Sequence, residues 1–398
     1  MRLDSDFVLI GTGVAPLVAA HQLIQQGKSV LILNPEFDFF GENSELPFDP
    51  FWPWNSHELD PVKIDQSQFE VVLSELQPEY PGPIESWPSQ NTGFRDPQAP
   101  FVRSRSRLWM KSLDEKAWSQ VEEMYVKASD AGFKPQLLEG LLALNRFPGL
   151  SVKKATDSER SKGVLFPKMA DVDVKRFRNG VREFMKERLG DERMVTHAGP
   201  IELMDDAVRF RQEGTSKTVR VNEGVLIFWT PRLTQWITSL CKRFEVKPIM
   251  PTGVRVWEDW SLISKDPVDP SIIGAMDDLL AWADVEGEPE EGNTFRLGVL
   301  CAGPKIPMEQ ARLDTHSADS SWASSGSFQR ISRFCHEFLK WDKFTVRSMK
   351  ARTILEWAEE PTSFILTRGA YEARVFNRAD GALSQVVKMA KFAGDPLR

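Results

Sequence analysis

The sequence of 398 residues has little cysteine and no long hydrophobic run. Its three cysteines, Cys241, Cys301 and Cys335, are far apart and match no zinc-binding or redox spacing, so they predict no disulfide framework and favour a reducing compartment. No apolar run approaches the roughly 18 residues of a membrane-spanning helix. The chain turns acidic directly after Met1-Arg2, so we expect no signal peptide and a cytoplasmic protein.

Basic charge and catalytic motifs are also missing. The formal net charge is −7 and no basic stripe occurs, which argues against a nucleic-acid partner. The five histidines are scattered, and the sequence has no HExxH, CxxC or Ser-His-Asp pattern, so it predicts no metal site and leaves catalytic residues unknown. The chain does have 41% hydrophobic and 27% charged residues, as globular proteins with a large core do, and its length predicts two or three domains.

Residues 6–34 read as strand, glycine turn, helix and strand. Residues 7–10 are a continuous apolar run of the kind that is buried on both faces of a parallel sheet. Gly11-Thr12-Gly13 then turns the chain, residues 14–26 have helical spacing, and residues 29–33 supply a second apolar strand. Such a turn lets backbone amides and a helix N-terminus face a pyrophosphate. We therefore expect a dinucleotide site, the alternative being a strand–helix–strand unit without a ligand.

The candidate ligand residues of that site are Gly11, Thr12, Gly13, Val14, Ala15 and Pro16 around the turn, and Asn34, Pro35 and Glu36 after the second strand. Two of them depart from the usual fingerprint. Pro16 replaces the third glycine of the motif, although proline suits the first turn of a helix. Asn34 stands where an acid usually takes the ribose hydroxyls, and an amide hydrogen-bonds a ribose more weakly than a carboxylate does.

Later stretches extend the same pattern. Helical spacing covers residues 174–189, and a buried apolar strand at 224–229 ends in Thr230-Pro231. Leu137, Leu138, Leu141 and Leu142 predict a further helix, whereas residues 272–287 fit either a strand or a helix. We expect one parallel sheet built from residues 6–10, 29–33, 225–229 and 363–366, with the helix from Val14 covering it.

The C-terminal block begins with the apolar run 364–366, which leads to Arg368-Gly369. Asp380-Gly381-Ala382 follows, and Asp380 is a good N-cap for a last helix. The amides after such a cap can receive a pyrophosphate or a flavin carbonyl. The alternative is a terminal helix with an ordinary cap.

The order of these blocks resembles the superfamily of flavin-containing amine oxidases, phytoene desaturases and protoporphyrinogen oxidases, whose fold also houses UDP-galactopyranose mutase. There, an N-terminal glycine motif, a helix, a hairpin and a buried strand precede a C-terminal segment with a Gly–Arg pair and an Asp-capped helix. The resemblance implies an α/β protein with a Rossmann-like FAD-binding domain assembled from three discontinuous segments, residues 1–60, 160–232 and 350–398. Residues 61–159 and 233–349 would form a mixed α+β domain for substrate or partner.

The resemblance also implies one non-covalent FAD and an oxidoreductase that acts on a small apolar or amine-bearing molecule. The pyrophosphate would lie at Gly11–Gly13, the adenosine near Asn34 and Ile201, and the flavin end near Gly369 and Asp380. Aromatic residues and methionines of the segments 37–54 and 233–350 would line the pocket. In such enzymes the redox chemistry belongs to the flavin, and the protein provides binding and orientation.

A second interpretation comes from the stretch Phe39-Phe40-Gly41-Glu42, which replaces the superfamily's Gly–Gly–Arg turn beside the isoalloxazine. This stretch and the GTG turn are similar to Rab GDP-dissociation inhibitors and escort proteins, which share the fold and bind prenylated small GTPases without flavin chemistry. The alternative prediction is therefore a protein-binding or accessory module that has this fold and no redox activity.

Overall fold

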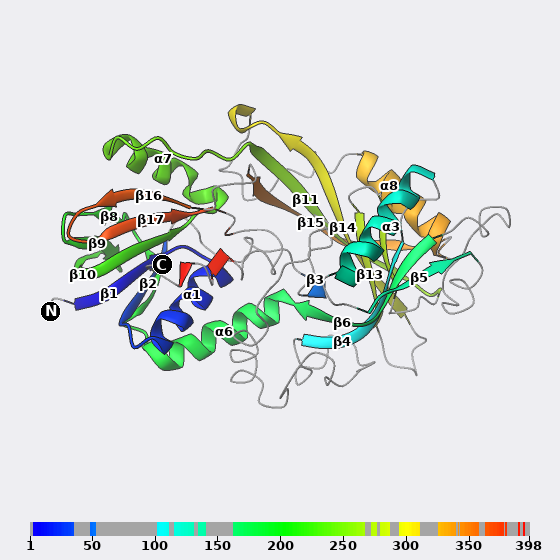
Figure 1. Ribbon diagram of the computed structural model, residues 1–398, viewed down its shortest axis with the longest axis horizontal. Helices are drawn as coiled ribbons and strands as arrows, with labels where there is room; N and C mark the ends of the chain where they lie inside the picture. The colour runs from blue at the N-terminus through cyan, green and yellow to red at the C-terminus, as the bar shows by residue number, and fades with distance from the viewer. Residues whose placement is uncertain are drawn as a thin grey trace.

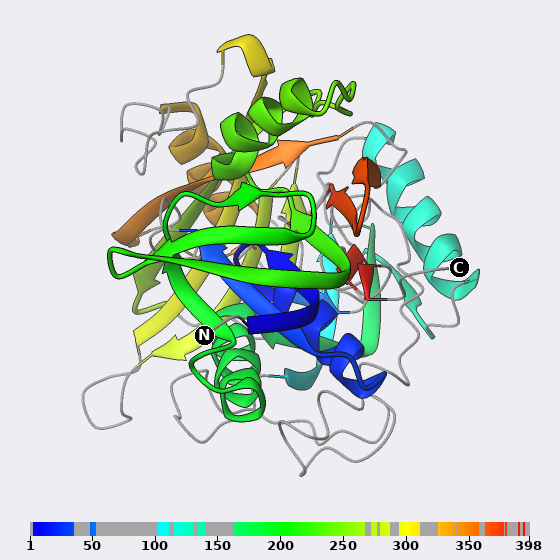
Figure 2. The same ribbon diagram turned by 90° about the vertical axis from the view of Figure 1, so that its left-hand side faces the viewer.

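Two sheets, each carrying helices, make up the computed structural model (Figure 1). The structure describes residues 3–35, 48–52, 102–110, 115–130, 134–140, 162–266, 272–276, 279–286, 294–310, 325–339, 341, 343–357, 363–377, 379, 389–390 and 393–394. Figure 2 views the molecule from the side of the first sheet, with strands of the second sheet behind it. The predicted mixed α/β class is confirmed.

The first sheet draws its strands from three distant parts of the chain. They are β1 (Leu3–Ile10), β2 (Val30–Pro35), β7 (Met194–Ala198), β8 (Glu202–Leu203), β9 (Ala207–Gln212), β10 (Thr215–Phe228), β16 (Ser363–Arg368) and β17 (Glu372–Phe376). The order along the sheet is β16-β17-β10-β1-β2-β7, with β9 pairing antiparallel to β10 and β8 to β9. The neighbours from β17 to β7 are all parallel, so their carboxyl ends meet at one edge.

The apolar run in β1 is buried on both faces of this sheet, as its composition predicts. Phe7 and Leu9 pack on one face with helices α1 (Val14–Gln25) and α6 (Val174–Leu189). Val8 and Ile10 point to the other face, where they join a core with α7 (Thr234–Arg243). Figure 1 shows α1 and α6 on one side of the sheet and α7 on the other.

The second sheet is mainly antiparallel. Its strands are β3 (Phe48–Trp52), β4 (Val102–Met110), β5 (Gln136–Glu139), β6 (Lys162–Asp173), β11 (Gly253–Ser264), β12 (Ile272–Met276), β13 (Leu279–Glu286), β14 (Thr294–Ile306) and β15 (Thr345–Glu356). They follow the order β15-β11-β14-β13-β12-β4-β6-β3, with β5 also on β6 and the pair β12–β4 parallel. Helix α8 (Ser325–Phe338) packs on one face, while α3 (Glu115–Asp130) and two short 3-10 helices, η2 (Pro231–Leu233) and η4 (Met308–Gln310), complete the described elements.

The structure corrects two of the strand and helix predictions. Residues 363–366 do lie in the first sheet, but β16 is antiparallel to β17, and β17 takes the parallel place beside β10. Leu137 and Leu138 belong to strand β5 instead of a helix, and Leu138 is buried where β5 pairs with β6, whereas Leu141 and Leu142 lie outside the described residues. Residues 272–276 and 279–286 form two strands, which settles the open choice in favour of strand. The helix from Val14, in contrast, is confirmed.

Candidate functional site

The carboxyl edge of the first sheet gathers the residues that follow four neighbouring strands. Thr12 follows β1, Asn34 lies at the end of β2, Thr230 follows β10, and Asn377 follows β17. All four strands run in one direction in adjacent positions. Open α/β sheets bind their ligands at such an edge. The fold therefore brings the predicted glycine turn and Asn34 together, and it adds two residues that the motif does not include.

The turn at this edge requires glycine at two positions, Gly11 and Gly13. Gly11 has φ +157°, and a Cβ there would lie 2.8 Å from the Cβ of Phe228 on β10. Gly13 is the N-cap of α1 with φ 78° and ψ −155°, a region that is essentially restricted to glycine. Gly13 makes no side-chain hydrogen bond to the helix, and the first turn of α1 carries no acid. The start of α1 is the positive end of the helix dipole and therefore favours an anion.

Three buried polar atoms at the same edge have no hydrogen-bond partner among the described residues: Thr12 Oγ1, Asn34 Oδ1 and Thr230 Oγ1. Thr12 and Thr230 are each 2% exposed. Leaving such a group unsatisfied costs about 1–3 kcal/mol, so buried polar atoms normally have partners. Three of them around one glycine turn indicate that the folded chain keeps hydrogen-bonding capacity for a polar ligand.

The remaining predicted residues around the turn have mainly packing roles in the structure. Val14, Ala15 and Pro16 are buried in the first turn of α1, where the lost amide hydrogen of Pro16 would have no helical partner in any case. Pro35 is buried at the end of β2. Ile201 follows the carboxyl end of β7, its side chain is buried in the core beneath α7, and its carbonyl accepts a hydrogen bond from Trp236 Nε1 at 3.2 Å.

Arg368 and Gly369 lie at the opposite edge of the sheet. Arg368 is the last residue of β16, and Gly369 begins the turn into β17, which runs from there towards the edge that carries the glycine turn. The Gly369 amide donates to the Tyr371 carbonyl at 3.1 Å, and Arg368 forms an exposed ion pair with Glu372. The structure thus does not bring this pair together with Gly11–Gly13. Glu36, Asp380, Gly381, Ala382 and the stretch Phe39–Glu42 are outside the described residues.

Other classes of site are not found in the described part of the chain. No group of three or more His, Cys, Asp or Glu side chains there is arranged to hold a metal ion. Nor does any helix within the described ranges have the length and apolar character of a membrane span.

The three cysteines have no reactive character. Cys241, Cys301 and Cys335 are buried thiols, and burial raises the pKa of Cys241 and raises that of Cys335 to about 12. Because the thiolate is the reactive form, we expect the native protein at pH 8 to react with an aromatic disulfide reagent at least roughly 100-fold more slowly than the unfolded chain. Absorbance of the released thiolate measures this, and three thiols should titrate in denaturant. A thiol that reacts within seconds in the native state would contradict the prediction.

Comparisons with known proteins find matches to the fold among solved structures. No family model matches the sequence, and no curated protein matches it. Among solved structures, NikD, described as an unusual amino acid oxidase essential for nikkomycin biosynthesis, matches in its open form with a TM-score of 0.63, 16% identity, and coverage of 99% of this chain and 94% of that one. Glycine oxidase from Bacillus cereus ATCC 14579 matches with a TM-score of 0.63, 14% identity, and coverage of 98% and 96%. Iminodiacetate oxidase from Chelativorans sp. BNC1 matches with a TM-score of 0.62, 12% identity, and coverage of 98% and 93%.

These three proteins are named as oxidases of amino acids or related compounds. The sequence had instead suggested amine oxidases, desaturases and protoporphyrinogen oxidases. The likeness runs over nearly the whole of each chain, so both sheets take part in it. At such low identity it establishes the fold alone, and the activity has to be argued from the site.

Proposed function

We propose that this protein is an FAD-dependent oxidoreductase that oxidises a small amine-bearing molecule. The observation that carries the proposal is a set of three buried polar atoms that have no partner in the described part of the chain, at Thr12, Asn34 and Thr230, around a turn where only glycine fits. The FAD-binding domain would comprise residues 1–60, 160–232 and 350–398, and the substrate domain would comprise 61–159 and 233–349. A cytoplasmic location is part of the same proposal.

The described residues fit the adenosine diphosphate half of FAD. The start of α1 is the positive end of the helix dipole and favours a diphosphate, and the glycine turn lets that group approach the backbone. Asn34 Oδ1 can accept a hydrogen bond from a ribose hydroxyl, in the place where an acid usually does so. When bound, the flavin would accept a hydride from the substrate, and this chain would bind and orient it.

The substrate class is proposed from the comparisons, because the likeness to solved structures extends over the second sheet as well as the first. NikD, glycine oxidase and iminodiacetate oxidase have names that specify nitrogen-bearing acids, and they share the fold over both sheets. This favours an amine-bearing substrate over the apolar one that the sequence left open. A pocket lined by residues 37–54 and 233–350 stays a prediction, since much of the first segment lies outside the described residues.

The proposal is tested by purification and anaerobic reduction. The protein should be yellow, with about one flavin per chain, and a panel of amino acids and secondary amines should bleach the flavin band in the absence of oxygen, with recovery in air. A flavin that dithionite reduces but no amine does would reject the substrate class. A colourless protein that ignores added FAD would reject the oxidoreductase proposal and favour the alternative, a partner-binding module.

A further inference from the structure

Thr230 lies beside the glycine turn, although it is more than 200 residues away in the sequence. Strands β1 and β10 are parallel neighbours whose register pairs Ile10 with Ile227. One residue further on, Gly11 is in contact with Phe228. Thr12 and Thr230 therefore both follow the carboxyl ends of adjacent strands, and both are 2% exposed.

The Thr230 hydroxyl does not have the role that a threonine usually has at this position. Thr230 is the N-cap of η2, and an N-cap threonine normally accepts a hydrogen bond from the amide two or three residues later. Here that side-chain bond is missing, and the Thr230 carbonyl accepts from the Leu233 amide at 3.0 Å instead. The Thr230 hydroxyl has no partner among the described residues, whereas Thr234, four residues later, accepts a hydrogen bond from Trp229 Nε1 at 3.0 Å.

Each of these hydroxyls can donate one hydrogen bond and accept others. These two buried hydroxyls follow adjacent strand ends next to the start of a 12-residue helix, so they are a pair of donors at a positive dipole end. The ligand that satisfies such a set is an anion with several oxygens. An apolar ligand, in contrast, would leave both hydroxyls buried without partners.

We propose that Thr230 binds the diphosphate of the dinucleotide together with Thr12, as a ligand residue from the strand that neighbours the glycine turn. This inference rests on the proposed dinucleotide site. It adds a contact that the glycine motif does not contain, and it gives the second of the three chain segments a direct part in binding. Hydrogen bonds from a hydroxyl to a phosphate oxygen are charge-assisted and therefore strong.

The test is the affinity of Thr230→Val for FAD and for ADP, measured by flavin fluorescence quenching and by calorimetry on the full chain freed of co-purified flavin. Valine keeps the shape of threonine and removes the hydroxyl. We expect both ligands to bind roughly 10- to 100-fold more weakly, as the loss of one hydrogen bond to a charged group predicts. Thr230→Ser should restore the affinity to within about threefold, because it returns the hydroxyl.

Thermal unfolding separates binding from a structural role. Without ligand, Thr230→Val should melt no lower than the wild type, because it removes a buried hydroxyl that none of the described residues pairs with. Thr234→Val is the matched control: it removes the hydroxyl that pairs with Trp229, so it should melt lower and bind FAD as the wild type does.

Each outcome discriminates between the two proposals. If the wild type binds FAD and Thr230→Val binds it equally well, the Thr230 inference is wrong while the flavin proposal stands. If the wild type binds ADP but not FAD, and Thr230→Val weakens ADP binding, the inference stands and the flavin proposal falls. Binding of neither ligand by the wild type overturns both.

Discussion

Replacing Gly13 with aspartate is expected to abolish FAD binding. Gly13 has φ 78° and ψ −155°, where any other residue is strained by about 1–3 kcal/mol. Aspartate also puts a carboxylate at the start of α1, beside the proposed diphosphate. Like charges in contact cost several kcal/mol, so we expect the FAD dissociation constant to rise by more than roughly 100-fold. Equilibrium dialysis, together with the colour of the purified protein, measures it.

Two control variants separate charge from backbone strain. Gly13→Ala introduces the strain without the charge, so its effect on FAD binding should be clearly smaller than that of Gly13→Asp. Gly27→Asp repeats the change at the other end of α1, where φ is +77° and a Cβ meets nothing within 4 Å. It should cost stability and leave FAD binding unchanged. If the Gly13→Asp protein remains yellow, the diphosphate does not bind at this turn.

Local pattern was sufficient to predict the strand–turn–helix–strand unit. The run from Phe7 to Ile10 is apolar without interruption because α1 and α7 cover both faces of the sheet. The C-terminal strands were harder to predict, because the sequence of a short strand does not show whether it runs parallel or antiparallel to its neighbours. Residues 363–368 and 372–376 form a hairpin, and only the register from Gly224–Glu372 to Phe228–Phe376 shows which strand is parallel to β10.

Parts of the candidate site could be predicted where a sequence motif defines them, but not where tertiary contact does. Gly11 and Gly13 are recognisable because the turn excludes side chains. Thr230 gave no comparable signal, since its place beside Gly11 follows from the pairing of β1 with β10. Tertiary contact also sets the position of Arg368 and Gly369: the β16–β17 hairpin carries them to the edge opposite the glycine turn, with Gly369 near the Asp205 carbonyl.

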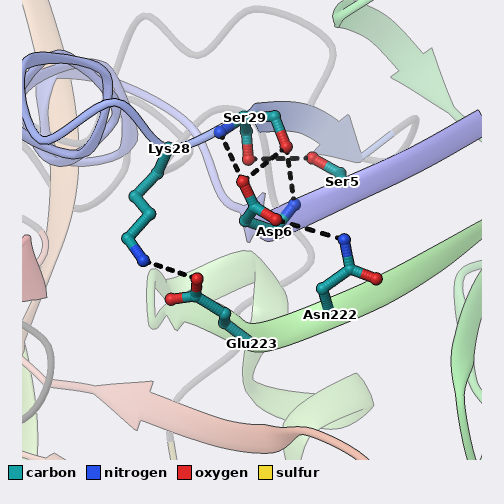
Figure 3. A network of polar contacts seen from close by, with 6 residues as sticks. All are labelled: Ser5, Asp6, Lys28, Ser29, Asn222 and Glu223. Atoms are coloured by element: carbon teal, nitrogen blue, oxygen red, sulfur yellow. Dashed lines mark hydrogen bonds and ion pairs between the residues drawn. The ribbon is translucent and has the colours of Figure 1, made fainter.

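The two edges of the first sheet differ in how their polar groups are satisfied. Beside the amino end of β2, Asp6 Oδ2 in β1 accepts hydrogen bonds from the amide and the hydroxyl of Ser29, both at 2.8 Å. Figure 3 shows these contacts. Asn222 on β10 donates to Asp6 Oδ1 at 3.1 Å. At the carboxyl edge, Thr12 and Asn34 each keep a buried oxygen without a partner among the described residues. The polar groups around Asp6 thus stabilise the fold at one edge, and the proposed ligand site lies at the other.

The Asp6 cluster therefore predicts a large loss of stability that is separate from binding. We expect Asp6→Asn to lower the free energy of unfolding by about 2 kcal/mol at pH 7, since a carboxylate that accepts three hydrogen bonds becomes an amide with one acceptor oxygen. Urea denaturation measures the difference. Glu223→Gln is the control: it breaks only the partly exposed ion pair with Lys28, which is worth at most about 1 kcal/mol.

The same cluster sets the pH dependence of that difference. Hydrogen bonds from the Ser29 amide and the Asn222 side chain, with help from the Ser29 hydroxyl and the Lys28 charge, lower the pKa of Asp6 against the opposing effect of burial. A lowered folded-state pKa gives stability that is present above the unfolded value of about 3.9 and is lost as pH falls through the folded value. The wild type should thus exceed Asp6→Asn in stability at pH 5–7, and the gap should narrow below about pH 4, where the protonated carboxyl and the amide are both neutral. A gap that stayed constant down to pH 2.5 would show that the charge of Asp6 does not stabilise the fold.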